Sequence, residues 1–232
     1  MISDTTDTQT RALVLANGAP PAREVFDRLA EVSGAFFCVD GGANWAAREG
    51  VVPVAAFGDF DSVLETTRTV FQEVPFILTQ NQEFTDLEKA LGEVIQRGYN
   101  SISLLGAVGD RVDHSLALPG ALLRYRQQAA ITCHTDTEDF FLLSQSIRLS
   151  TAEGQRVSIL PVFGPAFVKT RGLRYPLNDE KLQMGIRDGV SNSAMGSVAQ
   201  ISVRENPVLV VIERQSLSQF NFAPRVAAST LQ

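Results

Sequence analysis

Acidic residues follow the short apolar runs in the first half of this 232-residue chain, each time in a turn-like segment. The segments are Asp40–Asn44, Gly58–Ser62, Glu83–Asp86 and Gly106–His114. Open α/β sheets bind ligands at the edge where their strands end, so carboxylates repeated there would load that edge with oxygen atoms. Magnesium prefers oxygen ligands and usually shares them with the phosphates of a substrate. The spacing therefore predicts a magnesium–nucleotide site.

Asp59 and Asp61 form the sharpest of these motifs, because they stand two residues apart directly after an apolar run. Two such carboxylates can point into one crevice and hold a divalent ion together with phosphate oxygens. The alternative is an ordinary turn, since Gly, Asp and Ser are common turn formers and Ser62 could cap the next helix. The motif alone leaves both interpretations open.

Thr85 and Glu88 have the spacing of a capping box, which predicts a helix that begins here and ends near Gly98. In the first turn of that helix, Asp86 would complement the helix dipole without any further function. The same helix start can also bind phosphate, and Asp86 would face the sheet edge that carries the acidic turns. Lys89 lies three residues on, as either a phosphate ligand or a solvated surface lysine.

The longest motif, Gly106–His114, combines features of an anion-binding loop. Its glycines allow the backbone to approach an anion closely, and Arg111 offers a bidentate fork for phosphate. Asp113 and His114 would open the next helix. A plain loop with an N-cap is the alternative, but the combination favours an active-site loop. Neither the G-x-G-x-x-G fingerprint nor a Walker A motif occurs, so a nucleotide site of another kind is expected.

Apolar runs alternate with helical patterns up to about Arg126, which favours βαβ units and a mostly parallel sheet. Beyond that point short β-rich runs separated by turn residues predict an all-β sandwich or small barrel. The polar stretch Gly189–Ser193 is interpreted, taken alone, as a loop. The predicted organisation is a disordered tail at 1–10, an α/β nucleotide- and metal-binding catalytic domain at 11–130, and a β domain at 131–232.

Composition excludes several classes of protein. The chain is 44% hydrophobic and 20% charged, as in ordinary soluble proteins, and its net charge of −6 argues against a nucleic-acid partner. Its apolar runs are too short to span a membrane, and its N-terminus lacks the pattern of a signal peptide. Cys38 and Cys133 fit free thiols in a reducing cytoplasm. We therefore expect a cytoplasmic protein without a membrane partner.

Taken together, the motifs resemble the thiamine pyrophosphokinase (thiamine diphosphokinase) family. The resemblance extends from Leu13–Gly18 through the acidic turns and Thr85–Leu91 to Gly172–Leu177, Gly189–Asn192 and Val208–Val211. It implies an α/β domain that binds nucleotide and metal, a β-sandwich that helps to bind thiamine, and a homodimer. It also implies a transferase that moves a pyrophosphoryl group from ATP to the thiamine hydroxyl, giving thiamine diphosphate and AMP.

The resemblance also implies roles for individual residues. Asp59, Asp61 and Asp86 would be catalytic carboxylates that hold Mg²⁺, and Arg111 and Asp113 would belong to the phosphate and active-site loop. The residues expected to bind nucleotide or thiamine are Asp40, Gly41, Asn44, Lys89, His114, Ser191 and Asn192.

The chain departs from the family pattern in two segments. The run before Asp86 has Asn81 and Glu83 where the family often has Asp, and the last loop has Asp110 where the family usually has Gly. These changes bear on nucleotide affinity and on the geometry of the metal. Two rivals therefore remain: a diphosphokinase for another alcohol, such as a hydroxymethyl-pterin, and a non-catalytic regulator that binds nucleotide or thiamine.

Overall fold

The computed structural model describes residues 10–79 and 83–224. The predicted tail at 1–10, except for Thr10, and positions Asn81 and Gln82 lie outside the described residues. The described chain divides into two compact units, one up to Asp136 and one from Thr137 to Pro224. The break falls six residues after the predicted boundary at residue 130, because β6 (Ala130–His134) pairs with the sheet of the first unit.

The first unit contains a parallel sheet with the strand order β6-β5-β1-β2-β3-β4. Its other strands are β1 (Arg11–Leu15), β2 (Ala35–Val39), β3 (Ala55–Gly58), β4 (Phe76–Leu78) and β5 (Ser101–Leu105). β1 and β5 are buried along their whole length, as expected for parallel strands covered on both faces. This is why they appear in the sequence as continuous apolar runs.

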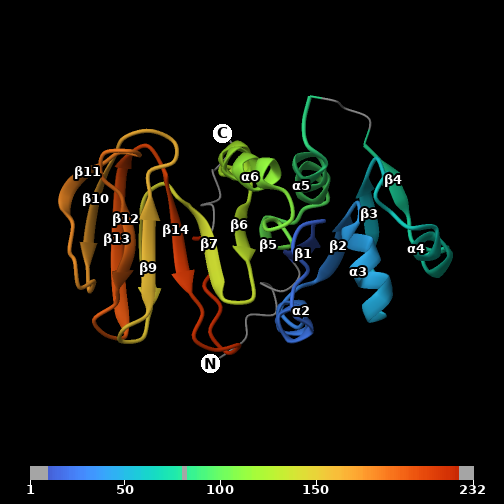
Figure 1. The fold of residues 1–232 in the computed structure, drawn as a ribbon, viewed down its shortest axis with the longest axis horizontal. Helices are drawn as coiled ribbons and strands as arrows, with labels where there is room; N and C mark the ends of the chain where they lie inside the picture. The colour runs from blue at the N-terminus through green and yellow to red at the C-terminus, as the bar shows by residue number, and fades with distance from the viewer. Residues whose placement is uncertain (1–9, 80–82, 225–232) are drawn as a thin grey trace. The chain divides into compact units, whose positions relative to one another are not determined.

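Helices cover both faces of this sheet, as Figure 1 shows. On one face lie α2 (Arg23–Ala30), α3 (Gly42–Glu49) and α4 (Glu65–Val70), and on the other lie α5 (Asp86–Gln96) and α6 (Val112–Tyr125). The change of face follows from the strand order: the chain moves outward from β1 to β4 and then returns through α5 to β5, beside β1. β1 and β5 therefore flank the point where the winding of the sheet reverses.

The second unit is an antiparallel sandwich. One sheet has the order β12-β9-β14-β7 and the other β11-β10-β13-β8. The strands are β7 (Glu138–Leu143), β8 (Ser146–Ser150), β9 (Arg156–Leu160), β10 (Ala166–Arg171), β11 (Asn178–Leu182), β12 (Gly189–Ser193), β13 (Val198–Glu205) and β14 (Val208–Glu213). Their inward side chains form one buried cluster that includes Phe141, Ile159 and Ile201. The predicted fold class is confirmed in both units.

One prediction in this unit was wrong. Gly189–Ser193 was interpreted as a loop, but it forms strand β12, which pairs with β9. β12 is an edge strand with an irregular register. Val190 and Ser191 are exposed and Asn192 is buried, so the strand lacks an alternating apolar pattern.

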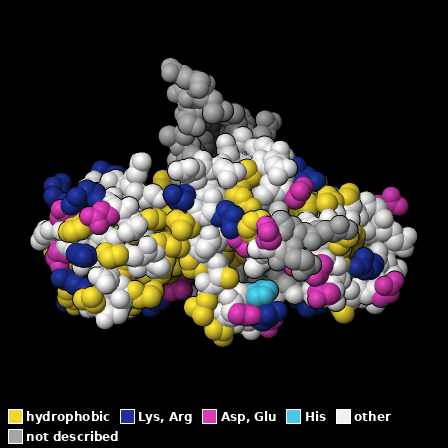
Figure 2. Space-filling model, turned by 90° about the horizontal axis from the view of Figure 1, so that it is seen from above, with side chains coloured by type: hydrophobic (Ala, Val, Ile, Leu, Met, Phe, Trp, Pro, Cys, Tyr) yellow, Lys and Arg dark blue, Asp and Glu magenta, His cyan; other side chains and the backbone are white. Residues whose placement is uncertain are grey.

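The second unit also exposes large apolar side chains. Figure 2 shows hydrophobic side chains gathered on its surface, at the left of that view. The exposed large apolar residues described in this unit are Tyr175, Met184, Ile186, Val190, Met195 and Leu217. The N–H of Tyr175 donates to Asn192 Oδ1 on β12, the strand that also carries Val190. The N–H of Met195 donates to the carbonyl of Gly172, three residues before Tyr175.

Candidate active site

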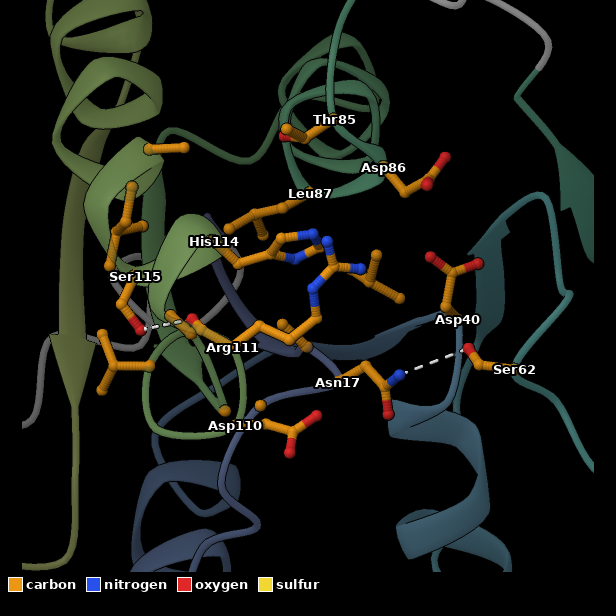
Figure 3. Close-up of a pocket in the computed structure, with 18 of the residues that line it drawn as sticks. Asn17, Asp40, Ser62, Thr85, Asp86, Leu87, Asp110, Arg111, His114 and Ser115 are labelled. Carbon is orange, nitrogen blue, oxygen red and sulfur yellow. Dashed lines mark hydrogen bonds between the residues drawn. The ribbon is translucent and has the colours of Figure 1, made fainter.

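A pocket of about 480 Å³ opens at the carboxyl ends of the parallel strands. Its walls come from the segments that follow β1, β2, β3 and β5 and from the first turns of α5 and α6. Figure 3 shows side chains from these segments surrounding the pocket. Because β1 and β5 flank the reversal of the winding, the pocket occupies the place where doubly wound sheets bind ligands.

Glycines allow the two loops at the centre of the pocket to touch. The N–H of Gly18 donates to the carbonyl of Gly106 at 2.7 Å, and the N–H of Ala19 donates to the carbonyl of Val108 at 2.9 Å. A Cβ at Gly18 would collide with the backbone of Gly106, and a Cβ at Gly106 would collide with Ala16. Gly106, which was predicted to give an anion access to the backbone, thus also allows the loops after β1 and β5 to pack together, as Gly18 does.

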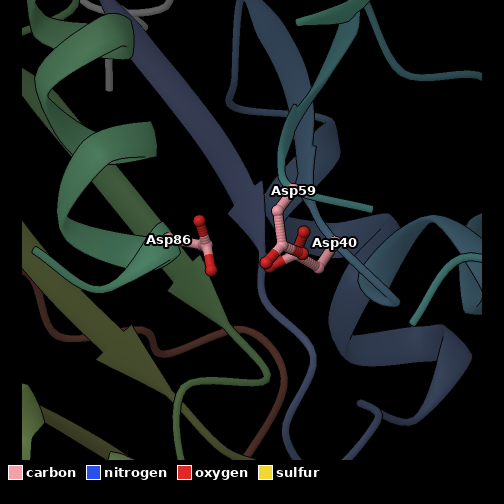
Figure 4. Close-up of side chains that lie close together, drawn as sticks. All are labelled: Asp40, Asp59 and Asp86. Atoms are coloured by element: carbon pink, nitrogen blue, oxygen red, sulfur yellow. The ribbon is translucent and has the colours of Figure 1, made fainter. Parts of the chain in front are cut away.

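Three carboxylates meet at one end of the pocket. Asp40, Asp59 and Asp86 each offer an oxygen that lies within 4.8 Å of the others. Figure 4 shows Asp40 and Asp59 side by side after β2 and β3, with Asp86 facing them from the first turn of α5. In the described part of the chain, Asp61 is not in this group, although it lines the same pocket and its N–H donates to Asp59 Oδ1. Asp40 therefore joins two of the three predicted ligands.

The local backbone turns Asp40 into the cluster. Asp40 has a positive φ of 43°, and its Oδ1 accepts the N–H of Phe60 at 3.2 Å. Gly58 lies against the Asp40 carboxylate, and because it has no Cβ it does not collide with that group. Burial, together with the nearby charges of Asp86, Asp59 and Asp61, raises the pKa of Asp40 to about 6, although the Phe60 hydrogen bond opposes the shift. A cation placed among these oxygens would relieve this repulsion.

The donor set fits a hard divalent cation. All three groups are carboxylates, two of them are partly buried, and each comes from a different segment of one sheet edge. Oxygen donors of this kind suit magnesium, which keeps part of its coordination shell for water and substrate phosphates. The residues present therefore match the metal expected from the sequence, with Asp40 as an additional candidate ligand.

The predicted capping box positions Asp86. The N–H of Glu88 donates to Thr85 Oγ1 at 3.3 Å, and the N–H of Thr85 donates to Glu88 Oε2 at 3.1 Å, so this prediction is confirmed. Lys89 does not line the pocket: its Nζ lies 2.6 Å from Asp86 Oδ1 and donates to the carbonyl of Thr79. It is therefore not a solvated surface lysine.

Arg111 lines the pocket but is paired within its own loop. Its Nε and Nη2 donate to the two carboxylate oxygens of Asp113 at 3.1 and 2.6 Å. The hydrogen bond from Arg111 lowers the pKa of Asp113 to about 2. Figure 3 shows the Arg111 side chain extending over the pocket, with His114 and Asp110 also at its wall. The structure thus brings Arg111 and His114 to the pocket, whereas Asp113 is not among its lining residues.

Gly41 and Asn44, two residues predicted to bind ligand, are not among those that line the pocket, and both bond to the segment that follows Asp59. The N–H of Gly41 donates to Ser62 Oγ, and a Cβ on Gly41 would collide with Asn17. The Asn44 amide donates to the carbonyl of Ser62 at 2.9 Å and accepts the N–H of Leu64 at 3.0 Å. Both residues therefore hold the segment that follows Asp59.

Sequence reasoning did not assign Asn17 and Ser62 to the pocket, although both line it. Asn17 Nδ2 donates to Ser62 Oγ at 3.2 Å across the pocket floor (Figure 3). Ser62 does not cap the following helix, whose N-cap residue is Leu64. The position of Asn17 directly after the first apolar strand, at the same edge as the acidic turns, was the available signal.

Ser191 and Asn192, which were predicted to bind ligand, lie on β12 in the second unit. Asn192 is buried, and its amide bridges both backbone groups of Tyr175, donating to the carbonyl at 2.7 Å and accepting the N–H at 3.1 Å. Ser191 has a positive φ of 59°, and its N–H donates to Ser158 Oγ. Asn192 thus fixes the turn at Tyr175, while the Ser191 side chain is exposed.

Comparison with known proteins links this geometry to one family. A family model for the thiamin pyrophosphokinase catalytic domain matches residues 26–133, and one for the thiamin pyrophosphokinase vitamin B1 binding domain matches residues 144–208. The curated thiamine pyrophosphokinase of Bacillus subtilis is 24% identical over 75% of this chain and 84% of its own length. Thiamine pyrophosphokinase 1 of Oryza sativa subsp. japonica is 25% identical over 67% of this chain and 70% of its own.

Solved structures agree in fold. Yeast thiamin pyrophosphokinase superposes with a TM-score of 0.79 at 17% identity, covering 91% of this chain and 89% of that chain. The Bacillus subtilis structure gives 0.78 at 20% identity, covering 89% of this chain and all of the other. With both domain models matched in order along most of its length, the chain belongs to the thiamine pyrophosphokinase family.

Proposed function

We propose that the protein is a thiamine diphosphokinase that transfers the pyrophosphoryl group of ATP to the hydroxyl of thiamine. The observation that carries this proposal is the group of three carboxylates, Asp40, Asp59 and Asp86, at one end of a pocket that Arg111 also lines. The family models over both units support thiamine as the acceptor. The vitamin B1 binding model disfavours the pterin acceptor, and the catalytic-domain model disfavours the non-catalytic regulator.

The reaction forms one bond and breaks one. The thiamine hydroxyl oxygen attacks the β-phosphorus of ATP, and the bond from that phosphorus to the oxygen bridging it to the α-phosphorus breaks. AMP leaves with the bridging oxygen, and the hydroxyl proton passes to a base. Asp113, Asp40 and His114 are the candidates for that base. Positioning and charge neutralisation supply most of the catalysis in transfers of this kind.

Within the pocket, the chain's own residues would divide the work. Asp40, Asp59 and Asp86 would hold Mg²⁺, with Asp61 a further predicted ligand, and Mg²⁺ would neutralise charge on the phosphate oxygens. Arg111 would leave Asp113 and give its two donors to phosphate oxygens, since both carboxylate and phosphate match its fork. Such an exchange costs little, because the Arg111–Asp113 pair is exposed to solvent.

The acceptor test compares alcohols under one set of conditions. Purified protein with Mg²⁺ and ATP is given thiamine or a hydroxymethyl-pterin, and the diphosphorylated product is quantified by chromatography. The proposal predicts thiamine diphosphate and no pterin diphosphate. Product with the pterin alone would reassign the acceptor, and binding of ATP and thiamine without any product would indicate a regulator.

We further propose that the protein is a cytoplasmic homodimer. The apolar side chains exposed on the second unit, among them Tyr175, Val190 and Met195, are suited to burial against a second copy. Among the described residues, no helix is long and apolar enough to cross a membrane. Sedimentation analysis would show a dimer, and Val190→Asp and Met195→Asp would shift it toward monomer. A monomer at all concentrations would contradict the proposal.

A further inference from the structure

Lys89 is largely shielded from solvent beside the acidic cluster. Its side chain is 11% exposed, and its Nζ lies 2.6 Å from Asp86 Oδ1 in the first turn of α5. The same Nζ donates to the carbonyl of Thr79 at 3.0 Å. Two of the three donors of the ammonium group are therefore used, and both point toward the chain segments that flank the cluster.

These contacts connect Lys89 to the opposite side of the cluster. The N–H of Thr79 donates to the carbonyl of Gly58 at 3.0 Å, and Gly58 directly precedes Asp59. Lys89 thus links Asp86 to the end of β4, and β4 in turn to the end of β3. Asp59 and Asp86 lie on segments far apart along the chain, and this series of hydrogen bonds fixes the position of one relative to the other.

We propose that Lys89 is a positioning residue, which holds the Asp86 carboxylate in the orientation that a divalent cation requires and balances one negative charge of the cluster. The inference rests on the proposed metal site and extends it by one residue. Partners that orient the ligands of a metal typically change its affinity by about 10- to 100-fold when they are removed. Lys89 acts here through Asp86, and does not contact phosphate.

The test measures Mn²⁺ binding to the nucleotide-free protein by electron paramagnetic resonance, with Mn²⁺ standing in for Mg²⁺. Lys89→Met should weaken binding by about tenfold or more, although it removes a positive charge, because the Asp86 carboxylate loses its anchor. Lys89→Arg keeps both charge and donors and should restore most of the affinity. Lys181→Met, at an exposed lysine of β11, provides the matched control and should bind as the wild type does.

A double-mutant cycle separates positioning from a general loss of structure. In an Asp86→Asn background, Lys89→Met should have little further effect on Mn²⁺ binding, because the route through Asp86 is already broken. Thermal unfolding confirms that each variant is folded, and Lys89→Gln replaces Lys89→Met should the latter not fold.

Three results would overturn the inference. Unchanged or tighter Mn²⁺ binding by Lys89→Met would contradict positioning. Unchanged Mn²⁺ binding with weakened ATP binding would make Lys89 a phosphate ligand, leaving the proposed function intact. A wild-type protein that binds no Mn²⁺ would remove the metal site itself, and the role of Lys89 with it.

Discussion

At the residue scale, Asp40 shows how much the structure adds to the sequence. The sequence placed it near the crevice, but its partners, Asp59 and Asp86, come from segments 19 or more residues away. Its positive φ and the collision-free space at Gly58 depend on how β2 and β3 lie together. Chemical type and position at a strand end were readable from the sequence; the distances between carboxylates were not.

Asp40 should make the stability of the metal-free protein depend on pH. Its pKa is raised to about 6, so the folded state binds the proton more tightly than the unfolded state does. Protonated Asp40 therefore contributes to the free energy of unfolding. This contribution is complete below the ordinary pKa near 4 and is lost as pH rises through about 6. Asp40→Asn removes the charge and should therefore gain stability relative to the wild type between pH 4 and pH 7. Urea unfolding in a chelator checks this, and a difference that does not change with pH would contradict it.

Asp40→Asn should also lose activity while it gains stability. Loss of one carboxylate from the group should lower turnover by about 100-fold or more, as removal of one group that stabilises transition-state charge does in other enzymes. Steady-state kinetics with saturating Mg²⁺ measures the change. Turnover within a few-fold of the wild type would exclude Asp40 from the working site.

Asp113 should matter less than Arg111. Arg111 lines the pocket, whereas Asp113 pairs with it from outside the lining. Arg111→Ala should lower kcat/KM by about 100-fold, because it removes a bidentate phosphate donor, and Asp113→Asn should have a much smaller effect. Kinetics with varied ATP tests the difference. Equal losses would instead support the predicted catalytic role of Asp113.

At the element scale, the sequence was most informative where a helix or strand has a strong local signal of its own. The buried parallel strands and the capping box at Thr85 were predicted, because long apolar runs and paired cap residues leave few alternatives. β11 and β12 are mostly polar and lack an alternating apolar pattern, so their pairing depends on neighbouring strands that the local sequence does not reveal. β6 lies at the predicted division at residue 130 and pairs with β5, so the compact units divide after Asp136.

Asn44 joins three elements, and its loss should be felt in stability. From α3, its side chain binds the carbonyl of Ser62, the N–H of Leu64 and the hydroxyl of Thr67. It thereby caps α4, whose own N-cap residue offers no side-chain acceptor. Asn44→Ala should cost about 1–3 kcal/mol in the free energy of unfolding. Urea unfolding measures this cost, and Asn44→Asp, which keeps the acceptor oxygen, should lose less. Equal costs for the two variants would contradict the capping role.

At the scale of the whole molecule, the second unit combines a buried apolar core with a buried polar anchor. In the second unit the Arg214 side chain is 1% exposed and that of Asp139 is fully buried, and Arg214 Nη2 donates to Asp139 Oδ1 at 2.7 Å. Asp139 Oδ2 accepts the N–H of Asn221 at 2.8 Å. A segment beyond the last strand is thus fixed to the first strand of the sandwich.

Breaking this buried pair should strongly destabilise the second unit. Asp139→Ala leaves the Arg214 charge without its carboxylate in the interior, which typically costs about 3–5 kcal/mol. Denaturant unfolding followed by circular dichroism reports the change. Asp179→Asn, which breaks the exposed pair with Arg204, is the control and should cause little change. Similar effects in the two variants would contradict the distinction.

The family and fold class follow from motifs spread along the chain, whereas the site depends on how distant segments meet. The most direct test of the account is therefore the thiamine-dependent conversion of ATP to AMP by the wild-type protein and by Asp59→Asn, followed by ³¹P NMR. We predict one thiamine diphosphate for each AMP in the wild type and a loss of about 100-fold or more in the variant. ADP formation, AMP without thiamine diphosphate, or full activity of Asp59→Asn would contradict the claim that this carboxylate site transfers a pyrophosphoryl group to thiamine.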